Sequence, residues 1–223
     1  MSHPVSPDLD PELVAGLLES LASWDPRASV PLAHTFMRVG DDEALAAFDE
    51  LARTNPSAEE MLKNRYLSPI PDVAQLAALP DGSFGKEFER HLTSNDLDVN
   101  LLRESAFIEA HQARGDDVGY LAERGFQLHD LFHVLTGYDT TPLGEVRVVS
   151  FTVAQAPAPY PAMIIASRPL QMVLYRPQLL PLVMDAITEG WALGRKAKPL
   201  LVVRWEEQWE RPLTEIREEY DLV

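Results

Sequence analysis

Residues 127–149 read QLHDLFHVLTGYDTTPLGEVRVV and determine how the middle of the chain folds. Apolar residues at helical spacing predict a helix over 116–136, which Gly137 should end, because glycine is common just past a helix C-terminus. Thr141 followed by Pro142 is a typical N-cap and first helical residue, so a second helix should follow. Its start, EVRVVSFTV, is rich in β-branched residues, but the neighbouring sequence favours a helix. The stretch therefore predicts two helices joined by a short turn.

Helical periodicity also dominates the rest of the chain. Asp10 and Pro11 form an N-cap and first-position pair for a helix over 10–23. No linker, repeat or low-complexity tract divides the sequence. We therefore predict an all-α fold class with a single helical domain over residues 1–223. Further helices are expected at 41–53, 56–65, 72–79, from about 83, 161–175, 178–196, 201–209 and 212–221.

Composition limits the class of protein. With 223 residues and 46% hydrophobic side chains, the chain can form one sizeable core. The absence of cysteine excludes disulfides, thiolate metal ligands and a cysteine nucleophile. Residues 1–16 have the features of neither a signal peptide nor a transit peptide, and no uncharged apolar run is long enough to span a bilayer. We therefore expect a cytoplasmic protein.

The charge is acidic overall and unevenly distributed. A formal net charge of −16 disfavours nucleic acid as a partner, because phosphate binding needs a basic surface. Residues 146–204 nevertheless carry seven basic side chains and only two acidic ones. This segment could face an anionic ligand or a membrane surface, or it could form solvated helix faces.

Two histidines and two carboxylates in the 127–149 stretch could hold a metal ion. His129 and His133 lie about 400° apart around a helix, so they share a face and can bind one cation. Asp130 follows about 100° further round and could be a third ligand or a carboxylate that orients the histidines. Glu145 stands one place beyond the capping-box position, so capping does not account for it, and the chain could return it to the histidines. Such donors suit zinc, iron, cobalt or manganese.

The same pattern is compatible with different kinds of site. The two histidines could be a hydrogen-bonded pair in the core. A zinc protease helix fits worse, because it carries Glu rather than Asp beside the first histidine. A phosphohydrolase with a His-Asp doublet needs further ligands on other helices, for which His34, His91 and His111 are candidates without a clear pattern.

Three segments of the chain resemble one known family. HDLFHVLTGYDTTPLGE is similar to the His-Asp-x-x-His-(eleven residues)-Glu motif of the coenzyme Q biosynthesis protein family number four. LLVVRWEEQWERPLTEIREEYDL resembles that family's C-terminal Trp-Glu-x-x-Trp-Glu-x-Pro-Leu block, and LAALPDGSFGKEFERHLTSNDLD its upstream Leu-Pro-x-Gly segment. The resemblance covers most of the chain from about residue 68. Residues 1–40 carry least of the pattern and lack the mitochondrial leader of eukaryotic members, which indicates a bacterial type.

The resemblance implies a mostly helical domain with a role in ubiquinone biosynthesis. It also implies a metal-dependent lyase reaction, the oxidative decarboxylation of a prenylated benzoate precursor at ring position C1. The residues that match the family's metal ligands, and that we also expect to be catalytic, are His129, Asp130, His133 and Glu145. The cofactor implied is a divalent metal ion, which the resemblance suggests is zinc, with iron, cobalt or manganese as alternatives.

Two further functions remain as alternatives. The first is a non-catalytic scaffold that binds prenyl lipid and organises other quinone-biosynthesis enzymes, as the resemblance also allows. The second is a metal-dependent phosphohydrolase, suggested only by the His-Asp doublet. A prenylated substrate needs an apolar channel, and the helices of 160–194 could supply one. Their methionines, Met163, Met172 and Met184, could accommodate the isoprenoid tail or simply fill the core.

Two interactions of the whole molecule are also expected. The apolar helices of the second half exceed what one thin layer can bury, which suggests a homodimer. A lipid substrate and the basic segment suggest peripheral contact with the inner face of the plasma membrane. Trp191, Trp205 and Trp209 could anchor the protein at that interface, or they could be buried packing residues.

Overall fold

The computed structural model describes residues 10–23, 61–99, 117–156 and 158–223, with isolated positions 32, 35, 43, 46, 47, 50, 112 and 115. Within these residues the chain forms helices and no strand, apart from an isolated bridge between Ser83 and Pro212. The predicted all-α fold class is thus confirmed. The expected helix over 41–53 and the start of the one over 56–65 lie outside the described ranges.

The helices agree closely with the sequence pattern, and several begin at the expected caps. The side chains of Asp10, Ser83 and Thr141 each accept a hydrogen bond from a backbone N–H in the first turn of their helix. None of the helices in the described part combines the length and hydropathy needed to cross a bilayer. The elements are α1 Pro11–Ala22, α5 Val73–Ala77, α6 Phe84–Ser94, α8 Asp117–Thr136, α9 Pro142–Gln155, α10 Pro159–Tyr175, η2 Pro177–Leu179, α11 Leu180–Lys196, η3 Trp205–Glu207 and α12 Leu213–Glu219.

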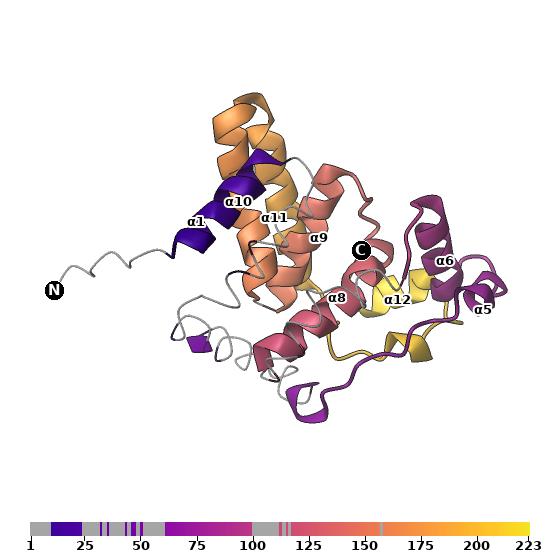
Figure 1. The fold of residues 1–223 in the computed structure, drawn as a ribbon. Coiled ribbons are helices and arrows are strands. Elements are labelled where there is room, and N and C mark those ends of the chain that lie inside the picture. Colours follow the sequence, from indigo (N-terminus) through magenta and orange to yellow (C-terminus); the bar gives the residue numbers. More distant parts are fainter. Residues whose placement is uncertain are drawn as a thin grey trace.

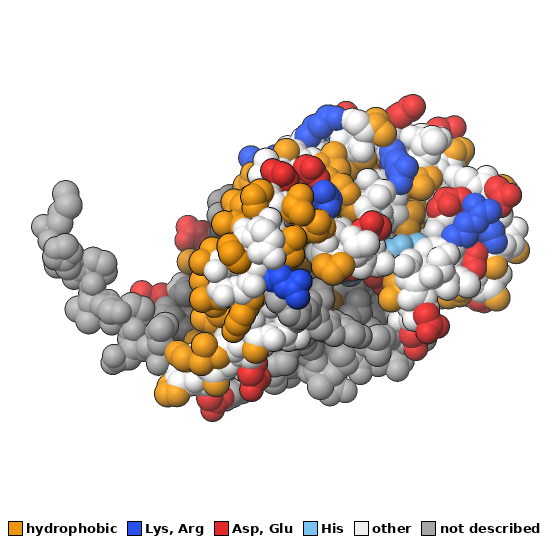
Figure 2. Space-filling model, turned by 90° about the horizontal axis from the view of Figure 1, so that it is seen from above, with side chains coloured by type: hydrophobic (Ala, Val, Ile, Leu, Met, Phe, Trp, Pro, Cys, Tyr) orange, Lys and Arg blue, Asp and Glu red, His pale blue; other side chains and the backbone are white. Residues whose placement is uncertain are grey.

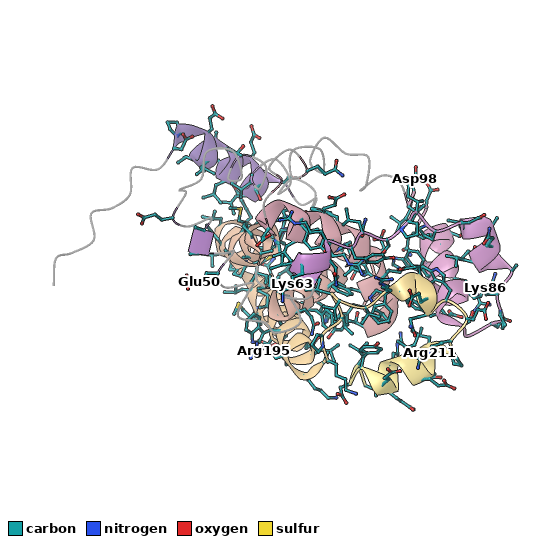
Figure 3. All side chains as sticks on the ribbon, turned by 90° about the horizontal axis from the view of Figure 1, so that it is seen from below. Glu50, Lys63, Lys86, Asp98, Arg195 and Arg211 are labelled. Carbon is teal, nitrogen blue, oxygen red and sulfur yellow. The ribbon has the colours of Figure 1, made fainter. Side chains whose placement is uncertain are left out.

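Helix α8 lies between two groups of helices (Figure 1). On one side α9, α10 and α11 pack together, with α1 against α10. On the other side α5, α6 and α12 gather at the C-terminal part of α8. The core residues come from both groups, and the labelled charged side chains Lys86, Asp98, Arg195 and Arg211 lie at the periphery (Figure 3). This arrangement surrounds the predicted histidine helix on both sides.

Helices α9 and α11 run parallel at unusually close range. A Cβ added at Gly190 would lie 2.1 Å from the carbonyl oxygen of Arg147, and one added at Gly194 would lie 2.6 Å from that of Phe151. Only glycine lets two backbones approach so closely. The two contacts lie one helical turn apart on each helix and follow the same direction, so they fix the register between α9 and α11. The register also fixes the position of Glu145 along the axis of α11.

The C-terminal block holds α6 in place. The first two N–H groups of α6, which have no partner inside the helix, donate to the carbonyls of Arg211 and Trp209 at 2.8 and 2.9 Å. The Trp209 ring stacks on Phe84 and Phe88 with centroids 5.0 and 5.6 Å apart. Two segments more than a hundred residues apart in sequence therefore form one unit, which presents α6 to α8.

The prediction of a helix over 201–209 was wrong, since only the short turn η3 forms there. The backbone oxygens of this segment serve a different purpose. The buried guanidinium of Arg124 donates to the carbonyls of Leu201 and Val203 at 3.2 and 2.7 Å. The indole N–H of Trp205 donates to the carbonyl of Leu200. Core side chains donate hydrogen bonds to these carbonyls, so the irregular segment has partners for its backbone. It therefore does not form the helix that the sequence pattern predicts.

The apolar residues singled out for lipid contact fall into different environments. Met172 and Trp205 are buried in the core, so packing accounts for them. Met184 and Trp191 are exposed, each with 45% of its surface accessible, on the outer side of α11. Local spacing does not distinguish the two pairs, because all four residues stand in apolar helical or near-helical patterns.

Candidate metal centre

Three of the four predicted ligands come together at the junction of α8 and α9. His129 and His133 lie one turn apart on α8, and Glu145 lies in the first turn of α9. The Nε2 atoms of His129 and His133 are each 3.3 Å from an oxygen of the Glu145 carboxylate. The donor atoms of the three residues all lie within 4.8 Å of one another. They form a compact group of two imidazoles and one carboxylate.

The hydrogen bonding of His133 fixes which of its nitrogens is free. Its Nδ1 lies 3.0 Å from the carbonyl oxygen of Tyr138, which can only accept, so Nδ1 carries the hydrogen. In the neutral ring Nε2 is therefore a bare lone pair. This atom is buried, has no hydrogen-bond partner, and faces an oxygen of Glu145. Two acceptors directed at each other require a cation or a proton between them.

The distances from the two histidines to Glu145 fit a divalent metal ion. Zinc binds histidine nitrogen and carboxylate oxygen at about 2.0–2.2 Å, so two ligands at angles of 90–109° lie about 2.8–3.5 Å apart. Both observed histidine–glutamate separations, 3.3 Å, fall in this range. The Nδ1–H bond from His133 to a backbone carbonyl is also the usual way in which a ligating histidine is oriented. The donors present thus suit such an ion.

The centre is closed on one side and open on the other. The His133 side chain is 1% exposed, whereas those of His129 and Glu145 are 26% and 21% exposed. Burial alone would raise the pKa of Glu145, but the two histidines, which can donate to its carboxylate when they are protonated, outweigh burial and lower the pKa to about 2. Burial alone would lower the pKa of His129, but its bond to Glu145 raises it. An ionised carboxylate therefore persists beside the histidines.

The fourth predicted residue, Asp130, is not part of this compact group. It is half-buried on α8, and its charge acts on His129 and on His91 of α6. From the sequence, His91 was one of three candidate further ligands that showed no clear pattern. The other two, His34 and His111, lie outside the described residues.

His91 lies directly against the histidines of α8. Its ring stacks on His133 with centroids 5.2 Å apart, and its buried Nε2 has no hydrogen-bond partner. No local motif connects His91 to the other two. Only the packing of α6 on α8 therefore reveals it as part of the site.

The turn between α8 and α9 determines where Glu145 lies. Gly137 has φ of 77°, a left-handed conformation that glycine tolerates and that reverses the chain after α8. Asp139 then accepts hydrogen bonds from both the N–H and the hydroxyl of Thr141. A Cβ on Gly144 would lie 2.0 Å from the carbonyl oxygen of Asp139. The turn is therefore tight enough to bring Glu145 back against the helix that precedes it.

The end of α8 is held by an arginine from the C-terminal helix. The Arg217 guanidinium of α12 donates to the carbonyls of Val134 at 2.8 Å and Leu135 at 3.0 Å. These carbonyls belong to the last turn of α8 and have no partner within the helix. Burial lowers the pKa of the Arg217 guanidinium. Because His133 lies in the same turn, α12 stabilises the segment that carries a candidate ligand.

These features define a helical protein with a candidate metal centre between two consecutive helices. The chain belongs to the family described as "Coenzyme Q (ubiquinone) biosynthesis protein Coq4", whose model matches residues 21–223. The resemblance carried by the three sequence motifs is thereby confirmed.

Similar proteins are known from several animals. The chain is 31% identical over 185 residues to "Ubiquinone biosynthesis protein COQ4 homolog, mitochondrial" of Danio rerio, which covers 81% of this chain and 65% of the relative. The protein of the same name from Rattus norvegicus is 31% identical over 172 residues, 75% of this chain and 61% of the relative. That from Homo sapiens is 27% identical over 222 residues, 99% of this chain and 80% of the relative. The chain thus spans less than two thirds of the first two relatives.

A crystal structure supports the fold. It is that of a proposed ubiquinone biosynthesis protein from Nostoc punctiforme, and it matches with a TM-score of 0.76 and 23% identity over 95% of this chain and 97% of that chain. The two chains therefore share their fold.

Proposed function

We propose that this protein catalyses a metal-dependent step of ubiquinone biosynthesis, the oxidative decarboxylation of a prenylated benzoate precursor at ring carbon C1. The carboxyl leaves as CO2 and a hydroxyl from water takes its place, a two-electron oxidation in which dioxygen accepts the two electrons and leaves as hydrogen peroxide. Family membership supports the pathway. The observation that carries the catalytic part is the pair of acceptor atoms, His133 Nε2 and Glu145 Oε1, that face each other at 3.3 Å.

The chain's own residues would bind the ion and leave room for the substrate. His129, His133 and Glu145 would hold a divalent metal, which the resemblance suggests is zinc, with iron, cobalt or manganese as alternatives. When bound, such an ion stabilises negative charge on the ring oxygens as CO2 departs. His133 is kept in the ligating tautomer by Tyr138. The exposed sides of His129 and Glu145 give a substrate carboxylate or phenolate access to the centre.

Asp130 has a distinct proposed role in this scheme. Asp130 lies outside the three-residue group. We therefore propose that its negative charge orients the histidines and that it does not bind the metal directly. His91, whose ring covers one face of His133, would meet the substrate at the edge of the centre. In its host the protein would act in the cytoplasm at the inner face of the plasma membrane, together with other quinone-biosynthesis enzymes, and a homodimer remains a prediction.

The test combines metal analysis with turnover. Protein purified without chelators is subjected to elemental analysis and then incubated aerobically with a prenylated hydroxybenzoate. Mass spectrometry follows loss of the carboxyl and gain of the hydroxyl. We expect bound metal and product from the natural protein, and neither from His133→Ala or Glu145→Ala. Metal-free natural protein, together with variants that still restore quinone synthesis in a deficient strain, would refute the proposal.

The same experiment separates the alternatives. A scaffold would retain prenyl lipid in native mass spectrometry while no carboxyl is lost under any condition. A phosphohydrolase would release phosphate from a panel of esters in the presence of added divalent metals.

A further inference from the structure

A pocket lies on the opposite face of α8 from the candidate metal centre. Leu131, which lines this pocket, stands two residues from both His129 and His133, and therefore about 160° around the helix from each. The segment 66–72 and η3, which carry other lining residues, pass below α8 in Figure 1, whereas α9 lies above it. Seen from above, a histidine side chain reaches the surface (Figure 2). The pocket and the metal centre therefore lie on different faces of α8.

The shape and lining of this pocket, which we call the η3 pocket, suit a flat ring. Its volume is about 420 Å³, partly open to solvent. Small-molecule sites have volumes of about 300–1,000 Å³ and combine apolar walls with a few polar groups. The polar lining residues in the described part of the chain are Ser68, Gln127 and Glu206. Most of the wall consists of ring side chains: Pro69, Pro71, Phe88, Phe126, Trp205 and Trp209.

One carboxylate oxygen of Glu206 lacks a donor. The Tyr66 hydroxyl donates to Oε1, whereas Oε2 is buried and has no hydrogen-bond partner among the described residues. Burial raises the pKa of Glu206, because the charged form loses hydration that no donor replaces. A buried acceptor without a donor costs free energy. The η3 pocket therefore contains an acceptor that a ligand with an O–H or N–H group can satisfy.

The η3 pocket also contains a donor that is only weakly engaged. Gln127 Oε1 accepts hydrogen bonds from the backbone N–H of Ser68 at 3.0 Å and from Arg124 at 3.2 Å, which fixes the orientation of the amide. Gln127 Nε2 then reaches only the carbonyl of Ser68, at 3.5 Å. Such a long bond is weak, so this N–H group can donate to a ligand instead.

The charges around the η3 pocket favour a neutral ligand. Arg124 is 1% exposed, and its guanidinium donates to the lining residues Ser68 and Gln127. Solvent screens a buried charge poorly, so Arg124 repels a cation. The carboxylate of Glu206 repels an anion in the same way.

We propose that the η3 pocket binds a neutral phenol that carries a second oxygen next to its hydroxyl. The ring lies between the aromatic walls, the hydroxyl donates to Glu206, and Gln127 Nε2 donates to the neighbouring oxygen. The last torsion of a glutamate side chain has a broad energy minimum, so a small rotation brings Oε2 to the ligand. This binding needs neither the metal ion nor the reaction proposed above.

Two matched small molecules test the proposal. In 1,2-dimethoxybenzene a methyl group replaces the hydroxyl hydrogen of 2-methoxyphenol, so only the donor is lost. The four tryptophans of the full chain are labelled as 5-fluorotryptophan, and phenylalanine replacements assign their fluorine NMR signals. With 2-methoxyphenol we expect saturable shifts at Trp205 and Trp209, with a Kd of about 1 mM, and none at the exposed Trp191 of α11. The dimethoxy compound should bind at least about tenfold more weakly.

Single substitutions identify the groups that bind the phenol. Glu206→Gln removes the charged acceptor and should weaken binding of 2-methoxyphenol about tenfold. Glu207→Gln makes the same change one residue further on, at a side chain that is 61% exposed, and should bind like the natural protein. His133→Ala removes a candidate metal ligand and should also leave this binding unchanged. Circular dichroism verifies that each variant is folded.

Several results would overturn the proposal. These are equal affinity for the two small molecules, equal shifts at Trp191 and Trp209, the absence of any shift up to the solubility of 2-methoxyphenol, and unchanged binding in Glu206→Gln. Loss of binding in His133→Ala would also overturn it, since the phenol would then bind at the metal centre. Failure of the metal-dependent reaction leaves these results unaffected, so the two proposals are tested separately.

Discussion

His133 and Glu145 face each other at 3.3 Å with an acceptor atom on each side, because the single N–H of the neutral His133 ring is donated to the carbonyl of Tyr138. With neither a cation nor a proton between them, this arrangement costs free energy, since neither atom has a donor. The tight turn that creates it requires a glycine at position 144. Arg217 donates a hydrogen bond to the end of the helix that carries His133. The candidate centre is thus built into the packing of the fold.

Removing a candidate ligand should remove the metal. We expect His133→Ala and Glu145→Gln to lower the affinity for zinc by more than about 100-fold, because the loss of even an outer partner of a metal ligand costs about 10–100-fold. Asp130→Asn should retain the metal with a smaller loss, since Asp130 lies outside the compact group. Competition with a chromophoric chelator measures each affinity. An Asp130→Asn protein as depleted as the other two would place Asp130 among the ligands.

His91 should affect turnover without affecting the metal. Phenylalanine at this position keeps the ring that stacks on His133 but removes the buried Nε2 that has no partner. We expect His91→Phe to bind metal normally and to turn over the proposed substrate about tenfold more slowly, the value of one hydrogen bond to the substrate. His133→Phe is the matched control and should lose the metal. Unchanged turnover in His91→Phe would limit its role to packing.

Gly144 should tolerate no side chain. In Gly144→Ala the new Cβ would clash with the Asp139 backbone at 2.0 Å, so we expect a loss of about 2–3 kcal/mol of unfolding free energy and a lower metal affinity. Gly125→Ala in α8 is the control, because nothing lies within 4 Å of its Cβ. Alanine there should stabilise the helix by up to about 1 kcal/mol. Urea titration measures both, and equal stability of the two variants would contradict the role of the turn.

Arg217 should matter more than its neighbour Arg211. Arg217→Met removes two charge-assisted bonds to the end of α8, and we expect a loss of about 2 kcal/mol of unfolding free energy with weaker metal binding. Arg211→Met breaks a partly exposed ion pair to Glu219 and should cost less than about 1 kcal/mol. If metal affinity falls equally in both variants, a general loss of stability accounts for the effect, and the hydrogen bonds from Arg217 to α8 have no specific role.

The metal-free protein should be most stable in a narrow pH range. Ionised Glu145 is favoured in the folded state, so its contribution is present above the ordinary pKa of 4.5 and is lost as the pH falls towards about 2. His129 has a raised pKa, so its contribution is complete below the ordinary value of 6.5 and is lost as the pH rises through the raised one. We expect a stability maximum between these ordinary values, worth about 2–3 kcal/mol.

Urea unfolding across pH with chelator present measures this maximum. Glu145→Gln should flatten the profile, because it removes the charge that both histidines stabilise. A profile with the same maximum in Glu145→Gln would assign the effect to different groups.

The sequence by itself determined the elements that depend on neighbouring residues. The helix over 116–136, its end at Gly137 and the new start at Thr141 follow from periodicity, a left-handed glycine and a side-chain cap, which all act within a few residues. The shared face of His129 and His133 follows from the same geometry. The helix expected over 201–209 does not form, because Arg124 and Trp205 bind the carbonyls of this part of the chain through their side chains.

Only the tertiary structure decided what depends on distant segments meeting. It returned Glu145 to the histidines, stacked His91 on His133, set Arg217 at the end of α8, and left Val173 exposed while burying Met172. Most of these outcomes are distances between residues far apart along the chain. Such distances are set by side-chain packing between helices, for which local spacing carries no information.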